Sequence, residues 1–249
     1  NTAWSGREEP AKAPEQQAWS GTEDFGGAEG AAGLHDNWDD PDGYYRVMLG
    51  EKLQQRYQIF AILGRGIFAT VVRARDLQQN GREVAIKIAR RQETMYKAGM
   101  KEISILQRLS EADPDNKMFI VHFFTHFEHR GHLCMVFESL GLNLREIVKR
   151  FGKDVGLNLQ AVKTYTKQML LALALLREKQ FVHADIKPDN ILVNEAKTIA
   201  KLADFGSAST ASEMEITPYL VSRFYRAPEI ILGQPHGCEM DMWLSLIHI

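Results

Sequence analysis

The sequence predicts an α+β fold in two lobes: a first lobe of five antiparallel strands with one helix, and a second lobe that is mainly helical. Two patterns support this prediction. Up to residue 140, short segments alternate apolar and polar residues between glycine-containing turns, as is typical of hairpins. After residue 140, apolar residues recur at helical spacing over a long segment. The composition, 45% hydrophobic and 25% charged, is that of a globular chain.

The strands of the first lobe are expected at residues 57–63, 68–74, 83–89, 120–127 and 133–137. Asn80-Gly81, a dipeptide that favours tight hairpin turns, precedes the third strand. The helix is expected at residues 94–109, where Ile103 and Leu106 lie on one face.

The second lobe begins with a short helix expected at residues 144–151 and a long one at residues 160–179. Polar extended segments follow at residues 181–193 and 199–205. A sheet lobe joined to a helical lobe through polar loops places a ligand cleft at their junction.

The segment 1–45 differs from the rest of the chain. It holds ten acidic and two basic residues, a net charge of −8, with one Leu and no Val, Ile or Met. Such a segment buries too little apolar area to offset the entropy of ordering, so we expect a mostly disordered acidic tail. The remaining residues carry a net charge of +6, which the overall value of −2 conceals. Trp4, Trp19 and Trp38 are either docking anchors or residues without a specific role.

Several classes of protein are disfavoured. Two cysteines, Cys134 and Cys238, are too few for a disulfide framework and fit a reducing compartment. No apolar run is long enough to span a membrane, and no leader peptide is visible. The longest basic cluster, residues 87–91, is short, so we expect no direct binding of nucleic acid.

A glycine-rich turn at Gly64 and Gly66 is the first motif that bears on chemistry. Glycines allow backbone N–H groups to approach phosphate oxygens, although a hairpin turn also needs glycine. Ala69 stands where a third glycine would complete the pattern. The alanine costs about 1–2 kcal/mol if that position needs a positive φ, and little if it needs only a small residue.

Lys87 ends an apolar strand and needs an acidic partner if it is buried. Glu102, on the next helix, is the natural partner. The alternative is a lysine that points into water.

Residues 183–190 read H-A-D-I-K-P-D-N and offer a base, a cation and a metal ligand within one loop. Asp204, in D-F-G, and Asn190 are hard oxygen ligands of the kind that Mg²⁺ takes beside nucleotide phosphates. The motif A-P-E follows at residues 227–229. Each motif alone is compatible with a surface loop, but their order and spacing together are not a coincidence.

Together these motifs resemble the eukaryotic protein kinases over residues 57–243. The resemblance implies that ATP and Mg²⁺ bind in the cleft and that protein hydroxyls are the substrate. Lys87, paired with Glu102, would hold the α- and β-phosphates. Asp185 would accept the proton of the substrate hydroxyl, and Lys187 would steady the transferred phosphoryl group. The Mg²⁺ ligands would be Asn190 and Asp204.

The resemblance also implies an adenine pocket. Phe137 would stand behind the base, unless it is plain core packing, and the backbone of Glu138 and Leu140 would bond it. The expected nucleotide contacts are Gly64, Gly66, Val71, Ala85, Lys87, Phe137, Glu138, Leu140 and Leu192.

Further residues indicate which kinases the chain resembles most. Lys187 is typical of the serine/threonine class, and residues 219–229 resemble the CMGC group near its dual-specificity tyrosine-regulated branch. Residues 37–46, with 183–195 and 216–226, resemble the pre-mRNA-processing factor 4 kinases, a family of nuclear splicing kinases. This implies a nuclear, monomeric kinase whose substrates include splicing factors, and an ordered segment 37–46 against the sheet.

One departure concerns regulation. Ala184 stands where most kinases carry the arginine that binds a phosphate in the activation loop. We therefore hypothesise that Tyr219 is phosphorylated and that Arg223 and Arg226 hold its phosphate. The alternative is that Tyr219 merely packs within the loop.

A second departure concerns the end of the chain. The kinase domain is expected to cover residues 46–249, with an N-lobe and hinge at 57–140 and a partial C-lobe at 141–243. Residues 244–249 do not continue the family pattern, so the C-lobe is expected to be incomplete. The alternative function is therefore a truncated, inactive fragment that acts as a binding module.

Overall fold

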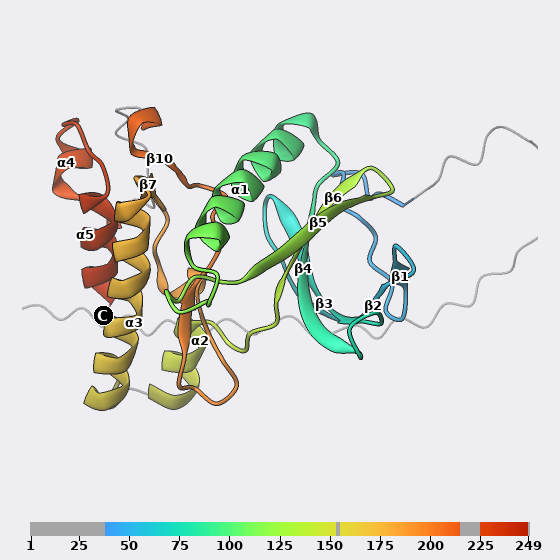
Figure 1. Ribbon diagram of the computed structural model, residues 1–249, viewed down its shortest axis with the longest axis horizontal. Coiled ribbons are helices and arrows are strands. Elements are labelled where there is room, and N and C mark those ends of the chain that lie inside the picture. The colour runs from blue at the N-terminus through green and yellow to red at the C-terminus, as the bar shows by residue number, and fades with distance from the viewer. Residues whose placement is uncertain (1–37, 153–154, 215–224, 249) are drawn as a thin grey trace, which may run out of the picture. The chain divides into compact units, whose positions relative to one another are not determined.

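The computed structural model describes residues 38–152, 155–214 and 225–248 (Figure 1). A curled antiparallel sheet with one helix is followed by a mainly helical part, so the predicted α+β, two-lobed arrangement is confirmed. None of the helices in these ranges is long and apolar enough to cross a bilayer.

The sheet has six strands, in the order β1-β2-β3-β4-β6-β5. They are β1 (Lys52–Leu53), β2 (Tyr57–Arg65), β3 (Ala69–Asp76), β4 (Arg82–Ala89), β5 (Phe123–His129) and β6 (His132–Glu138). The prediction of five strands was therefore wrong by one. The added strand β1 pairs with Tyr57 and Gln58, and its two residues are too few to produce a detectable alternation.

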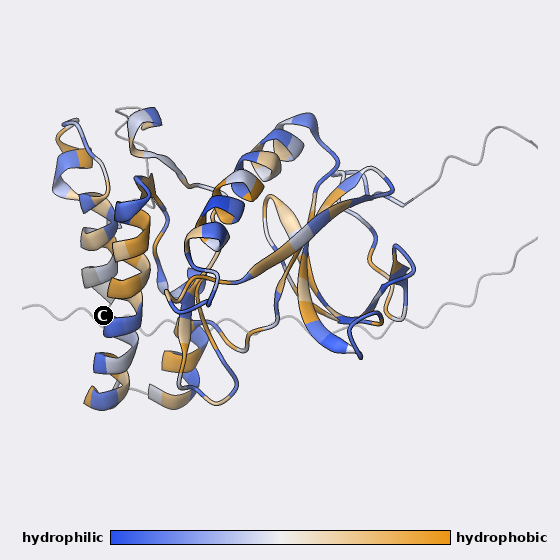
Figure 2. Cartoon of the chain, in the orientation of Figure 1, coloured by the Kyte–Doolittle hydropathy of each residue, from blue (hydrophilic) through white to orange (hydrophobic). Residues whose placement is uncertain are grey.

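Strand alternation gives the sheet two different faces. Val84, Ile86 and Ile88 of β4 are buried in a core within the curl of the sheet. Ala85 and Lys87 alternate with them and lie on the opposite face, toward helix α1 (Glu93–Ala112). Figure 2 shows the hydrophobic residues that line these strands.

Helix α1 lies against β4, β5 and β6 (Figure 1). Its apolar stripe, which includes Ile103, Leu106 and Leu109, is buried in a second core that continues into the helical lobe. Glu102 lies within the same buried stripe, so the packing of α1 presents a carboxylate to the sheet.

The helical lobe contains α2 (Leu144–Ile147), α3 (Leu159–Glu178), α4 (Pro228–Ile231) and α5 (Glu239–His248). The predicted helix 144–151 divides into α2 and a π-helical turn, Val148–Gly152. Two small antiparallel sheets lie in this lobe. One is the hairpin of β8 (Ile191–Val193) and β9 (Ala200–Leu202), and the other pairs β7 (Phe181–Val182) with β10 (Ser209–Thr210). Single 3-10 turns lie at Pro188–Asn190 and Ala211–Glu213.

Helix α5 packs beside α3 (Figure 1). Met240, Asp241 and Leu244 of this helix are buried. The helix continues through Trp243, the residue after which we expected the family pattern to stop, as far as His248.

Residues 38–46 form a small hairpin, called here the N-terminal hairpin. The backbone N–H of Arg46 donates to the carbonyl of Trp38, and Asp39 and Tyr45 form an antiparallel bridge. Tyr44 and Tyr45 are 8% and 4% exposed. The expected order of 37–46 is thus seen in residues 38–46, and the predicted disorder concerns residues before 38, which lie outside the described residues.

Candidate functional site

Lys87 connects three elements of the structure. Its ammonium donates to both carboxylate oxygens of Glu102 on α1, at 2.9 and 2.8 Å. It also donates to Oδ1 of Asp204, in the loop after β9, at 2.8 Å. The structure thus brings together one residue from the sheet, one from α1 and one from the helical lobe, which lie far apart in the sequence.

Lys87 and Asp204 stabilise each other in their ionised forms, whereas burial raises the pKa of Glu102 in spite of the neighbouring Lys87. Burial by itself would lower the pKa of Lys87, but attraction to the Glu102 and Asp204 carboxylates outweighs it and raises that pKa. Burial would raise the pKa of Asp204, yet the neighbouring Lys87 lowers it. The site therefore presents a fixed ammonium beside a half-exposed carboxylate.

Asp185 is the centre of a second network. Lys187 donates to its Oδ2 at 2.6 Å, and the Asn190 amide donates to the same oxygen at 2.9 Å and to the Asp185 carbonyl at 2.8 Å. One carboxylate is thus held by a cation and an amide from its own loop. A positioned carboxylate of this kind can accept a proton from a nearby hydroxyl.

His183 is a buried residue that holds the backbone of this loop. It is fully buried, and its Nε2 faces the Ala203 carbonyl at 3.1 Å. Since a carbonyl only accepts, Nε2 carries the proton, and Nδ1 accepts from the backbone N–H of Asp185 at 3.2 Å. The edge of its ring also meets Phe205, with centroids 4.8 Å apart. His183 therefore acts as a structural support for the loop that carries Asp185.

Asp241 of α5 holds the same loop from another side. Its two carboxylate oxygens accept from the backbone N–H groups of His183, at 2.6 Å, and Ala184, at 2.9 Å. Ala184 has a φ of +64°, a strained conformation for alanine that costs about 1–2 kcal/mol. The two hydrogen bonds compensate for this strain.

Asn190 and Asp204 are brought close by the backbone, because the N–H of Ala203 donates to the Asn190 carbonyl at 2.9 Å. The amide NH₂ of Asn190 is used on Asp185, which leaves its side-chain oxygen as a possible ligand. An amide oxygen and a carboxylate fit Mg²⁺. Within the described ranges no three His, Cys, Asp or Glu side chains form a metal cluster, so such an ion would complete its shell with phosphates and water.

The apolar residues predicted for the adenine pocket gather at the edge of the large core. Ala85 of β4 lies opposite Phe137 of β6 in the sheet register, and Leu192 is bridged to Asn143. Ala85, Leu140 and Leu192 are partly buried against that core, and Phe137 belongs to it. Val71, opposite Lys87 on β3, is also partly buried.

Some backbone groups of the segment between the lobes already form hydrogen bonds within the protein. The N–H of Glu138 donates to the His122 carbonyl at 3.0 Å, and the Leu140 carbonyl accepts from Arg73 at 3.0 Å. The side chain of Glu138 accepts from Lys201 at 2.6 Å. Lys201 is only 5% exposed and also donates to Asn116. This buried ion pair ties the segment between the lobes to β9, just before Asp204.

The glycine-rich turn connects β2 and β3. The Gly66 N–H donates to the Ala69 carbonyl at 2.9 Å, which closes the turn. Ala69 is paired with Ala89 in the sheet and has no positive φ. The position therefore needs only a small residue, and alanine there costs little. A Cβ added at Gly64 would meet no other atom within 4 Å.

Other expected residues lie elsewhere. Tyr219 and Arg223 are outside the described residues, and Arg226 lies just before α4. Lys201 and Asp241 were not among the predicted site residues. Their signals in the sequence were a lysine inside a short apolar strand and an aspartate inside an apolar helix.

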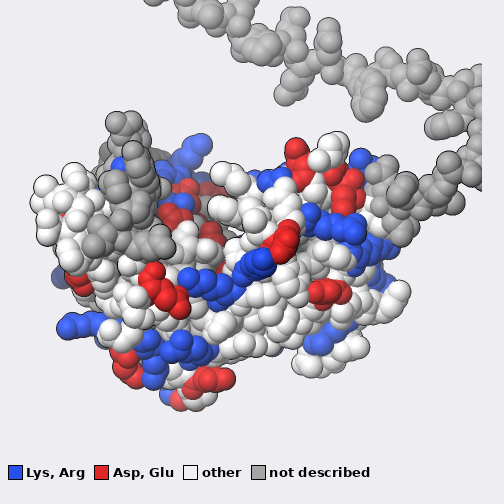
Figure 3. Space-filling view, turned by 90° about the horizontal axis from the view of Figure 1, so that it is seen from above, with Lys and Arg blue, Asp and Glu red and all other residues white. Residues whose placement is uncertain are grey.

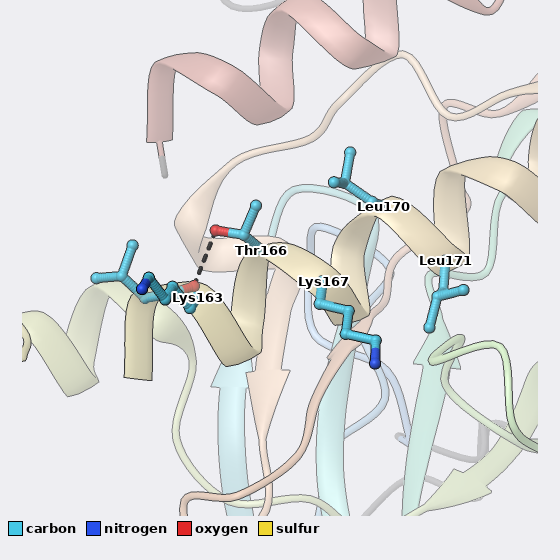
Figure 4. A pocket seen from close by; sticks show the side chains of 6 residues that line it. Lys163, Thr166, Lys167, Leu170 and Leu171 are labelled. Atoms are coloured by element: carbon cyan, nitrogen blue, oxygen red, sulfur yellow. Dashed lines mark hydrogen bonds between the residues drawn. The ribbon is translucent and has the colours of Figure 1, made fainter. Parts of the chain in front are cut away.

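A pocket on the outer face of α3 is separate from this site. Lys163, Thr166, Lys167, Leu170 and Leu171 line it together with Val162 (Figure 4). None of the predicted site residues contributes to it, so it carries no part of the chemistry above. On the face shown in Figure 3, basic and acidic side chains lie interspersed.

Comparison with known proteins agrees with this geometry. The family model described as "Protein kinase domain" matches residues 57–247. The match extends past Trp243, into the segment 244–249 that we expected to depart from the family pattern.

Individual relatives give the same result. Over 212 residues the chain is 58% identical to the serine/threonine-protein kinase prp4 of Schizosaccharomyces pombe. This match covers 85% of this chain and 44% of the relative. It is 50% identical to the serine/threonine-protein kinase prpf4B of Dictyostelium discoideum, over 84% of this chain and 26% of that protein. It is 40% identical to the DYRK-family kinase pom1 of S. pombe, in a match that covers 83% of this chain and 19% of that protein. The chain thus spans less than half the length of these relatives.

Proposed function

This chain belongs to the protein kinase domain family, and from that premise we propose that its cleft binds Mg·ATP and transfers the γ-phosphate to serine and threonine hydroxyls of proteins. The observation that carries the proposal is the bridge from Lys87 to both Glu102 and Asp204. It brings a cation of the sheet into contact with a carboxylate of the helical lobe that could bind Mg²⁺.

Lys87 would neutralise the α- and β-phosphates, with Glu102 fixing its position. Lys87, which contacts Asp204, would share its charge with the phosphates of a bound nucleotide, and Asp204 would hold Mg²⁺. Asn190 would supply the second ligand. The ion would contribute countercharge between the phosphates, which phosphoryl transfer needs more than covalent chemistry.

Asp185 would accept the proton of the substrate hydroxyl and orient its oxygen toward the γ-phosphate. Lys187, which contacts the Asp185 carboxylate at 2.6 Å, would also contact the transferred phosphoryl group. The base and the countercharge thus come from one loop, fixed by the bonds from Asn190 and from Asp241.

The adenine would lie between Val71 and Ala85 on one side and Leu192 on the other, next to Phe137. The backbone of Glu138 and Leu140 would bond its edge. The main support is that these residues gather at one edge of the core, beside Lys87.

The substrate class rests on relatives. The similarity to serine/threonine-protein kinases named prp4 and prpf4B supports serine/threonine specificity. Together with the resemblance in segments 37–46 and 183–195, it supports a nuclear role in pre-mRNA splicing, with splicing factors as substrates. We further propose a monomer whose kinase domain covers residues 46–249. We also propose that Tyr219 is phosphorylated and that Arg223 and Arg226 bind its phosphate.

The test uses the whole 249-residue chain, Mg·ATP labelled in its γ-phosphate and a serine-containing protein substrate. Asp185→Asn should lower the transfer rate by about 10²- to 10⁴-fold and leave the affinity for Mg·ATP unchanged, because a general base acts in the chemical step. Asp115→Asn, which removes an exposed carboxylate paired only with Lys117, is the matched control and should change neither quantity.

Two other outcomes discriminate between functions. Binding of Mg·ATP without any transfer would favour the alternative, a non-catalytic binding module. Transfer that survives Asp185→Asn at the unaltered rate would contradict the role proposed for Asp185.

A further inference from the structure

The N-terminal hairpin reaches the glycine-rich turn through one side chain. The hydroxyl of Tyr44 lies 2.9 Å from the Gly66 carbonyl and 3.0 Å from the Ile67 carbonyl. A hydroxyl has one proton to donate, so it serves both carbonyls in a shared hydrogen bond. Tyr44 is 8% exposed, and this contact is therefore part of the packed structure.

Two arginines enclose the Tyr44 ring. The Arg65 guanidinium lies 3.7 Å from the ring centroid, and that of Arg90 lies 4.6 Å from it. Arg65 also forms an ion pair with Asp40 of the hairpin at 2.6 Å, and Arg90 donates to the Ile67 carbonyl at 3.2 Å. Arg65, at the end of β2, and Arg90, just after β4, therefore both bind the hairpin, and Arg90 also donates to the Asp42 carbonyl.

The hairpin is itself anchored to the sheet at its base. Asp39 accepts from Nε2 of His132, a fully buried side chain, at 2.7 Å. The Arg130 guanidinium covers the Trp38 ring at 3.2 Å, and the Arg91 N–H donates to the Gly43 carbonyl at 2.8 Å. Because the N-terminal hairpin is fixed to the sheet, its Tyr44 side chain can hold the glycine-rich turn in place.

The hydrogen bonds of the turn show which of its backbone groups have no protein partner. The carbonyls of Gly66 and Ile67 are engaged by Tyr44, and the Gly66 N–H closes the turn onto Ala69. Across the described ranges, the N–H groups of Ile67 and Phe68 donate to no protein acceptor. Two such N–H groups in a turn whose carbonyls are held can donate to an anion.

We propose that Tyr44 is a positioning residue for nucleotide binding. Its hydroxyl connects the N-terminal hairpin to the glycine-rich turn and holds the turn in position to bind the phosphates. This inference rests on the proposed function, because it assigns the turn to the phosphates of Mg·ATP. It concerns the phosphate end of the nucleotide only. The adenine pocket, built from Ala85, Phe137 and Leu192, is not touched by Tyr44.

The test measures the affinities of the whole chain for Mg·ATP and for adenosine, which lacks phosphates, by calorimetry. Tyr44→Phe keeps the ring and removes the hydroxyl. It should weaken Mg·ATP binding about fivefold, the factor that corresponds to one hydrogen bond, and leave adenosine binding unchanged. Hydrogen exchange of residues 64–70 should become faster at the same time.

Tyr45→Phe is the matched control, because it removes the neighbouring hydroxyl of the same hairpin. The Tyr45 hydroxyl contacts Glu51 and Arg130, away from the turn. This variant should leave both affinities and the exchange of residues 64–70 unchanged.

Each result decides between the claims. Equal affinity of Tyr44→Phe and the unaltered chain for Mg·ATP would overturn the inference alone, and so would an equal loss for adenosine, which would indicate general destabilisation. If the unaltered chain binds neither ligand, the proposed function fails and this inference fails with it.

Discussion

Asp241 accepts a hydrogen bond at 2.6 Å from the backbone of His183, which lies 58 residues earlier in the chain. A second oxygen of the same carboxylate holds Ala184. A single buried side chain of α5 thus fixes the backbone of the loop that carries Asp185. The shape of the proposed catalytic loop depends on a helix far from it in sequence.

Replacing Asp241 with asparagine should therefore destabilise the fold and misplace the loop. An amide offers one oxygen, and its NH₂ opposes the second backbone N–H. We expect a loss of about 2–3 kcal/mol in the free energy of unfolding, measured by urea denaturation. Glu239→Gln, at an exposed position of the same helix, should cost less than about 1 kcal/mol. Equal losses for the two variants would show that the Asp241 contacts are unimportant.

Replacing Lys87 with methionine should abolish nucleotide-dependent chemistry. The variant removes the cation from Glu102 and Asp204 together and leaves the buried Glu102 carboxylate unpaired. We expect phosphoryl transfer to fall by at least about 100-fold, the effect of removing one charge-stabilising donor. Lys97→Met is the control, since Lys97 pairs with Glu93 on the exposed side of α1. Unchanged transfer in Lys87→Met would exclude Lys87 from the site.

The Glu138–Lys201 pair should behave as a coupled unit. Both side chains are largely buried, and their bond at 2.6 Å ties the segment between the lobes to β9. A double-mutant cycle of Glu138→Gln and Lys201→Met, read from the free energy of unfolding, should give a coupling of about 1–3 kcal/mol. The single variants should also weaken adenosine binding, because they loosen the backbone of Glu138. Additive effects would mean that the pair does not act together.

The Arg56–Asp76 pair predicts a pH dependence of stability. Two hydrogen bonds from Arg56, at 2.8 and 2.6 Å, lower the pKa of Asp76. A carboxyl whose pKa is lower in the folded state stabilises that state above its unfolded pKa of about 4, and this contribution is lost as the pH falls through the folded pKa.

Asp76→Asn should therefore reduce the free energy of unfolding by about 1–3 kcal/mol at pH 7. The difference from the unaltered chain should shrink steadily below about pH 4. A difference that stays constant from pH 7 to pH 2, measured by urea unfolding at each pH, would contradict this assignment.

Sequence reasoning was most successful where the signal is local. Strands β2 to β6 and helices α1 and α3 follow from alternation and helical spacing, and the site residues follow from motifs of a few residues. The contacts of Lys201 and Asp241 were missed because their partners lie 63 and 58 residues away. No periodicity within one segment reports such a pairing.

The N-terminal hairpin shows where composition misleads. Its acidic residues counted toward a disordered tail, yet Asp39 and Asp40 are paired with His132 and Arg65 of the sheet. Paired charges and docked aromatic rings replace the aliphatic core that the segment lacks. Only the resemblance in residues 37–46 indicated an ordered segment.

The central claim is that the cleft beside Lys87 is a site for Mg·ATP, with Asp204 as a metal ligand. Calorimetric titration of the whole chain with ATP, with and without Mg²⁺, tests it most directly. The unaltered chain should bind one ATP more tightly with Mg²⁺ than without it, and Asp204→Asn should abolish that difference. Absence of saturable binding, or the same gain from Mg²⁺ in both proteins, would contradict the account.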